Sequence, residues 1–188
     1  MSRWPSNPRG RLEQAAMDLF VERGYDQTTV AEIAERAGLT ERTFFRHFSD
    51  KREVLFQGGE LLQEAMVQTL AGTPPEVGPF DAVRAAITCV ATFFDERHDR
   101  SQLRQGIIDA HPELQEREVA KMAKIAGALA EGLRARGVGE PDARLAADAG
   151  IAVFRASFAQ WVRSEAGEMG KTMGECFAAL ENLVESGH

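Results

Sequence analysis

The side chains best suited to contact another macromolecule lie in one segment, residues 28–48, with the sequence TTVAEIAERAGLTERTFFRHF. Gly38 predicts a tight turn, because glycine adopts a positive φ without a Cβ penalty. Thr40 is suited to cap the next helix, and Phe44 and Phe48, four residues apart, predict its buried face. The outer and flanking faces then carry Glu41, Arg42, Thr43, Phe45, Arg46 and His47. A short helix with cations on its free face fits the major groove of DNA.

The elements that must position these side chains are helices. Strand signals are nearly absent, and apolar residues recur at spacings of three and four. We therefore expect an all-α fold, with an N-terminal three-helix unit over residues 9–52 and a larger helical unit over 53–188. The pattern predicts about nine helices: 9–23, 30–37, 41–47, from Asp50 towards Leu70, 80–96, 101–109, 112–136, 141–164 and a last helix that ends near Val184.

The charge of the chain is unevenly distributed. The net charge is −7, which argues against a protein that coats nucleic acid without specificity. Residues 1–52 carry a net charge of +1, whereas residues 53–188 carry −8. We therefore expect any DNA contact to come from the N-terminal unit.

An ordered set of motifs in residues 9–60 resembles the DNA-binding signature of TetR-type repressors. It includes Phe20–Tyr25, Ala37–Thr40 and Asp50–Lys51, with Thr29–Val30, Ile33–Ala34, Thr43–Phe45 and His47–Phe48 between them. The resemblance implies a helix-turn-helix over about 29–48, in which Thr29, His47 and Lys51 meet phosphates. It also implies that Glu41, Arg42, Thr43 and Arg46 lie nearest the base edges. Thr40, at the start of the same helix, is also expected among the DNA-binding residues. The family usually has Tyr where this chain has Phe45, which keeps an apolar contact and loses a hydroxyl.

The same resemblance implies an effector-binding and dimerisation domain after residue 52. A cavity is expected between the fifth and eighth helices, lined by some of the large apolar residues there: Phe93, Phe94, Ile107, Met122, Phe154, Phe158 and Trp161. The last three share one helix face, which meets either a ligand or another helix. An apolar stripe on the last helix is expected at a seam between two subunits: Met173, Phe177, Leu180 and Val184.

Gly58–Gly59 interrupts the predicted fourth helix. Each glycine costs about 1 kcal/mol relative to alanine inside a helix. The pair permits either close packing of a neighbouring helix or a soft point at which the DNA-binding unit tilts. Both interpretations remain open from the sequence.

Other functions are disfavoured by what the sequence lacks. An all-helical enzyme would need a nucleophile with a base, a carboxylate pair or a cofactor motif, and none is found. His98 with Asp95 and Asp99, and His111 with Asp109, lack the paired spacing of a metal site, so no metal or cofactor is expected. A helical adaptor that binds only protein is the third alternative.

Two distant cysteines and the absence of a run of 18 apolar residues predict a reduced, cytoplasmic protein with no membrane span. The favoured interpretation is a homodimeric, cytoplasmic repressor. It would bind a palindromic double-stranded DNA operator and be released by a small apolar or amphipathic effector, whose identity the sequence does not give.

Overall fold

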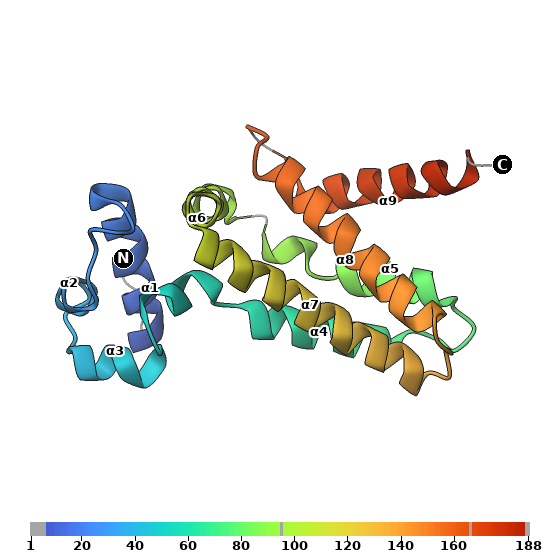
Figure 1. The fold of residues 1–188 in the computed structure, drawn as a ribbon, viewed down its shortest axis with the longest axis horizontal. Helices are drawn as coiled ribbons and strands as arrows, with labels where there is room; N and C mark the ends of the chain where they lie inside the picture. The colour runs from blue at the N-terminus through green and yellow to red at the C-terminus, as the bar shows by residue number, and fades with distance from the viewer. Residues whose placement is uncertain (1–6, 95, 166, 187–188) are drawn as a thin grey trace.

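The computed structural model describes residues 7–94, 96–165 and 167–186. These residues form helices joined by short loops and contain no strand, which confirms the predicted all-α fold (Figure 1). The helices run in the order α1 (Pro8–Arg23), α2 (Val30–Arg36), α3 (Glu41–His47), η1 (Lys51–Phe56), α4 (Gly59–Gly72), α5 (Pro79–Thr88), η2 (Ala91–Phe93), α6 (His98–Ala110), α7 (Pro112–Ala135), α8 (Asp142–Trp161) and α9 (Met169–Glu185), where η1 and η2 are short 3-10 helices. None of the described helices is long and apolar enough to cross a membrane.

Each of the first three helices begins at a side chain that accepts a backbone N–H. Asn7 caps α1, and Thr29 and Thr40 cap α2 and α3. Such caps satisfy donors that have no partner within the helix. The three helices enclose one apolar core, whose fully buried side chains include Leu12, Leu19, Ile33, Phe44 and Phe48.

The turn between α2 and α3 requires glycine at position 38 for two reasons. Its φ is +63°, which is unfavourable for residues with a Cβ. A Cβ would also lie 2.9 Å from Nη2 of Arg11, whose guanidinium donates to the carbonyl of Ala37. The turn therefore fixes α3 against both α2 and α1.

The predicted fourth helix is divided in two. Asp50 accepts the N–H of Glu53 at 3.1 Å, as predicted, but it begins the 3-10 helix η1 and not a long α-helix. Gly58 then adopts a left-handed φ of +80°, and α4 starts at the next residue. The expected continuous helix is wrong because this backbone conformation breaks it. The predicted fifth helix is also shorter, since α5 ends at Thr88 and η2 follows.

The remaining helices form a second bundle, in which α8 packs against α5, α7 and α9 (Figure 1). Met173 and Phe177 of α9 are buried in the core of this bundle, with 0% and 3% of their surface exposed. Their predicted place in a subunit seam is therefore wrong, because α9 uses this face within its own chain. Leu180 is partly buried against the same core, whereas Val184 is exposed.

Three residues from the second half of the sequence complete the core of the first domain. Ile107 and Ile108 of α6 and Leu114 of α7 are buried together with side chains of α1–α3 and η1. The predicted pocket position of Ile107 is therefore wrong. The packing unit of the N-terminal domain extends to Phe56 of η1 and includes the corner between α6 and α7.

Candidate nucleic-acid interface and effector cavity

Helix α3 presents two cations to solvent. Arg42 and Arg46 are exposed, and within the described part of the chain neither forms an ion pair or a hydrogen bond. Phe45 lies between them in sequence and is 55% exposed. A guanidinium with free donors is the side chain best matched to the O6 and N7 acceptors of guanine.

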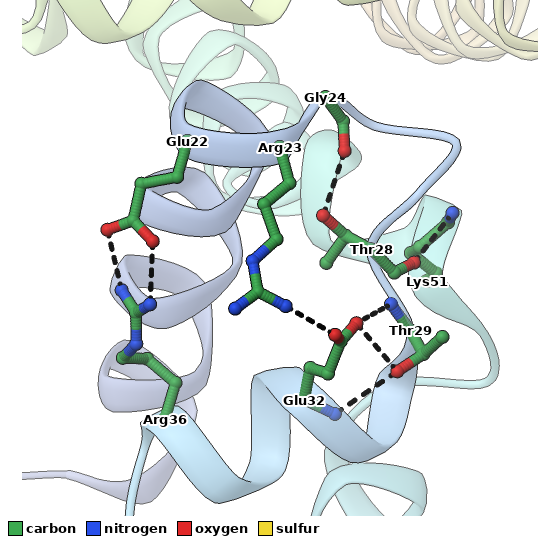
Figure 2. Close-up of polar contacts among 8 residues, drawn as sticks. All are labelled: Glu22, Arg23, Gly24, Thr28, Thr29, Glu32, Arg36 and Lys51. Carbon is green, nitrogen blue, oxygen red and sulfur yellow. Dashed lines mark hydrogen bonds and ion pairs between the residues drawn. The ribbon is translucent and has the colours of Figure 1, made fainter.

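Other arginines of the domain are already engaged with carboxylates. Arg36 makes two bonds to the carboxylate of Glu22, at 2.6 and 2.8 Å, and Arg23 bonds Glu32 at 2.6 Å (Figure 2). These pairs join α1 to α2 and neutralise their own charge. The free cations of the helix-turn-helix therefore concentrate on α3.

The threonines of the predicted interface hold helix ends in place. Thr40 accepts the N–H of Thr43 at 3.2 Å, and their hydroxyls are 3.1 Å apart. Thr29 and Glu32 form a reciprocal capping box at the start of α2 (Figure 2). Thr29, Thr40 and Glu41 are all exposed, and their contacts with DNA remain predictions.

Lys51 has a structural role that the sequence did not reveal. Its ammonium donates to the carbonyls of Tyr25 at 2.7 Å and Thr28 at 2.9 Å, and it lies 4.2 Å from the centre of the Tyr25 ring. Figure 2 shows Lys51 directed at the loop between α1 and α2. Burial lowers the pKa of this ammonium, and the nearby Asp26 only partly opposes the shift. The predicted phosphate contact remains untested, and a phosphate would have to compete with these carbonyls for the ammonium.

His47 also faces the protein. Its Nε2 is buried and has no hydrogen-bond partner among the residues that the structure describes. In this ring orientation a phosphate would have to be met by another atom of the side chain. The predicted phosphate contact of His47 therefore remains untested.

A cavity of about 910 Å³ lies between the two domains. Its apolar wall includes Phe56 and four of the predicted ligand-binding residues: Phe93, Phe94, Phe154 and Phe158. Its polar wall carries charged side chains of both signs that the sequence analysis missed: the cations Arg97, Arg100, Arg104 and Lys121, and the carboxylates Glu13, Glu53, Glu60, Glu64 and Glu118. The cations were missed because α6 and α7 meet η1 only in the folded chain, and no local pattern signals that meeting.

Two other predicted ligand-binding residues have different positions. Met122 lines a second cavity, of about 690 Å³, which shares Phe154 and Phe158 with the first. Trp161 has no exposed surface and donates its indole N–H to the carbonyl of Gly167 at 2.7 Å. Its predicted place in the cavity wall is wrong, because it is the buried end of α8.

A charged cluster is embedded in the wall of the larger cavity. Glu118 accepts from Arg104 at 2.5 Å and from Lys121 at 3.4 Å. Burial raises the pKa of Glu118, but the two cations outweigh it and the net shift is downward. For Lys121, burial and the positive charge of Arg104 lower the pKa against the opposing effect of Glu118.

Arg104 also connects this cluster to the DNA-binding domain. Its Nε donates to the carbonyl of Leu55 in η1, and its guanidinium lies 5.3 Å from the centre of the Phe56 ring. Arg117 approaches the same ring to 5.1 Å and pairs with Glu53. One wall of the cavity is thus bonded to the segment that leads from α3 to α4.

No grouping of three His, Cys, Asp or Glu side chains that would hold a metal is present among the described residues. Asp95, one of the acidic residues near His98, lies outside them.

Comparison with known proteins agrees with this architecture. Residues 13–57 match the model of bacterial regulatory proteins of the tetR family, and residues 77–185 match the model of the MftR C-terminal domain. The second match alone covers more than half of the chain. The chain therefore belongs to the TetR family of bacterial regulatory proteins.

Individual relatives differ in how much of the chain they cover. MftR of Mycobacterium tuberculosis is 24% identical over 92% of this chain and 90% of its own length. The transcriptional regulator TcmR of Streptomyces glaucescens is 38% identical, but the match spans 44% of this chain and 36% of TcmR. The structure of FadR from Bacillus subtilis in complex with stearoyl-CoA shares the fold, with a TM-score of 0.62, 20% identity, and coverage of 93% and 96% of the two chains.

We expect the arginines of α3 to contribute unequally to DNA binding and to base preference. Replacing whichever of Arg42 or Arg46 is bidentate to guanine by alanine should cost about 1–3 kcal/mol of binding free energy and relax preference at one base position per half-site. Arg36→Ala is the matched control, because its guanidinium is held by Glu22. Titration of each variant against an operator and its single-base variants measures both effects. Equal losses in all three variants, with base preference unchanged, would contradict this assignment.

Lys51→Met should destabilise the domain more than it changes the ionic component of DNA binding. Removing a charged donor from buried carbonyls should lower the free energy of unfolding by about 1.5–3 kcal/mol. The exposed Lys171→Met serves as the control. Urea unfolding gives the stability, and binding at several salt concentrations gives the salt slope. Unchanged stability with a salt slope reduced by about one would instead assign Lys51 to a phosphate.

Proposed function

We propose that this chain is a ligand-responsive transcriptional regulator that binds a palindromic DNA operator as a homodimer. The observation that carries the proposal is the pair of arginines, Arg42 and Arg46, that have no partner among the described residues and lie on an exposed helix held by a capped glycine turn. Two such helices related by a two-fold axis fit successive major grooves about 34 Å apart. The acidic remainder of the chain is then directed away from the phosphates.

The outer faces of α8 and α9 are the proposed dimer surface. Leu145 of α8 and Leu183 of α9 are exposed by 63% and 75%, and small exposed residues continue these faces. The small residues are Ala152 and Ala156 on α8 and Ala179 on α9. A two-fold interface requires a self-complementary patch, and two helices from each subunit supply it as a four-helix bundle. This replaces the stripe expected from the sequence, of which Met173 and Phe177 are buried within the chain.

The interdomain cavity is the proposed effector site, and the proposed ligand is an amphipathic anion. Phe93, Phe94 and Phe158 offer an apolar wall. Arg97, which forms no ion pair among the described residues, offers positive charge in the same cavity as the Glu118–Lys121 pair. A volume of about 910 Å³ lies within the range of small-molecule sites. FadR from Bacillus subtilis shares this fold and has stearoyl-CoA bound in its structure, which supports an acyl thioester as the first candidate.

Release from DNA would follow from competition at Arg104. An anionic group near Lys121 competes with Glu118 for the same two cations. If Arg104 turns towards the effector, its bond to the carbonyl of Leu55 is lost, and η1 is free to shift. A ligand changes such an equilibrium only through its different affinity for the two states, and a 100-fold release requires about 2.7 kcal/mol of coupling.

Selection of bound duplexes from a random-sequence pool tests the DNA-binding and dimer proposals together. The wild-type protein should enrich a palindrome with half-sites spaced by a turn of the helix or a multiple of it. Leu183→Asp should place a charge in the seam, yield monomers by light scattering and reduce operator affinity. Val21→Asp, at an exposed apolar residue of α1, controls for the added charge in the oligomer measurement. A Leu183→Asp variant that stays dimeric would contradict the proposed surface, and a pool with no enriched sequence would contradict the function.

Lys121→Met should weaken binding of an anionic amphiphile and leave the fold intact. With stearoyl-CoA as the probe, we expect a loss of about tenfold or more, the usual size for one charge-assisted hydrogen bond. Lys124→Met, at an exposed residue of the same helix, is the matched control. Isothermal titration calorimetry measures the affinity, and DNA release at saturating ligand measures the response. Equal affinity in wild type and Lys121→Met would place the anionic group elsewhere.

A further inference from the structure

His111 occupies the corner between α6 and α7, where it faces the DNA-binding domain. Its side chain is 18% exposed. The ring Nδ1 lies 2.6 Å from the carbonyl oxygen of Ile107, in the last turn of α6. The ring Nε2 lies 3.2 Å from Oδ1 of Asp26, in the loop between α1 and α2.

Both neighbours of this ring are hydrogen-bond acceptors. A carbonyl oxygen and an ionised carboxylate have no proton to donate. A neutral imidazole carries one N–H, so it satisfies one neighbour and directs a lone pair at the other. The imidazolium carries two N–H groups and satisfies both. The arrangement around His111 therefore matches the protonated ring.

The loop that accepts from His111 is held to the DNA-binding domain by further contacts. Tyr25, beside Asp26, packs its buried ring edge-on against the imidazole, with centroids 4.9 Å apart. Lys51 holds the same loop from the other side through the carbonyls of Tyr25 and Thr28. The His111–Asp26 bond thus joins the helix-turn-helix to the effector domain, in addition to the contacts of Arg104 and Arg117.

The charged groups around the imidazole favour its protonated form. Asp26 from the loop and Glu113 from α7 are the facing carboxylates, and Lys51 is the cation beyond the loop. Tyr25 stays neutral, since burial raises its pKa to about 12. The hydrogen bond to Ile107 is the largest effect on the pKa of His111 and raises it, whereas burial, the next largest, lowers it. The hydrogen bond to Asp26 and the charges of Asp26 and Glu113 add to the rise, so the net shift is upward. The negative end of the α6 dipole favours a cation at His111, and the positive end of the α7 dipole disfavours one. Because these two effects oppose each other, the two hydrogen bonds determine which form of the ring is favoured.

We propose that His111 is a proton-sensing latch that holds the helix-turn-helix against the effector domain and makes DNA affinity depend on pH. The protonated ring bonds α6 to the α1–α2 loop. Loss of the proton leaves a lone pair on one ring nitrogen facing an acceptor oxygen, so one of the two hydrogen bonds is lost. In a dimer, two recognition helices held at a fixed spacing bind with less ordering cost than two that move freely.

The direction of the effect follows from linkage. Because the pKa is raised in the folded state, the added stability is complete below the pKa of the unfolded chain. It is lost as the pH rises through the higher pKa of the folded chain. The latch is therefore closed in mild acid and open in mild alkali.

The test compares the full-length wild type with His111→Gln and Asp26→Asn between about pH 6 and about pH 8.5. Ring-proton resonances give the pKa of His111, which Asp26→Asn should lower. Asp109→Asn is the control, because its carboxylate accepts from Gln105 on the same helix. These measurements do not depend on DNA binding, so they remain decisive even if the proposed function fails.

Operator affinity supplies the functional readout. At the lower pH, wild type should bind the operator at least about fivefold more tightly than His111→Gln, and this difference should disappear at the higher pH. A purely structural role would weaken both ends of the pH range alike. Parallel pH profiles of wild type and His111→Gln, or a His111 pKa unchanged by Asp26→Asn, would overturn the proposal.

Discussion

The apolar core of the helix-turn-helix domain is completed by side chains from far along the sequence. Three helices and a 3-10 turn spanning some fifty residues bury only a modest share of their surface and are marginally stable alone. Ile107, Ile108 and Leu114 enter this core from the corner between α6 and α7. Any movement of the DNA-binding helices relative to the effector domain must therefore disturb this packing. Arg104 and His111 make polar contacts around the same corner, and these directional hydrogen bonds supplement the apolar packing.

Local signals in the sequence were sufficient to predict the helix-turn-helix. The capping threonines, the glycine turn and the apolar spacing all act within ten residues, and the structure has them where they were expected. The long helices α7 and α8 were predicted for the same reason, with ends displaced by a few residues. The division at Gly58 was not predicted, because a left-handed backbone depends on what packs beside it. A Cβ at position 58 would lie only 3.1 Å from Cζ of Phe93.

Residue roles that depend on distant partners could not be predicted from the sequence. Lys51 matches a phosphate-binding position of the family, but the carbonyls that hold its ammonium lie 23–26 residues earlier in the chain. Met173 and Phe177 form a convincing stripe on α9, and the same stripe serves a core or a seam equally well. The direction in which α9 turns back on α5 and α8 decides between them, and that direction is a property of the whole bundle. The charged wall of the cavity has the same origin.

An acidic protein can bind DNA when some of its cations are not paired with its own carboxylates. The number of such available cations matters more than the net charge. The helix-turn-helix has nearly equal numbers of both charges, so its net charge says little about where phosphate or base contacts arise. Carboxylates of α1 and α2 engage Arg23 and Arg36, whereas α3 leaves its two arginines unpaired among the described residues. The engaged pairs fix the angle between helices, and the unpaired ones keep their donors for a partner. Specific recognition needs both, because a bidentate guanidinium discriminates between bases only if the helix that carries it is held in place.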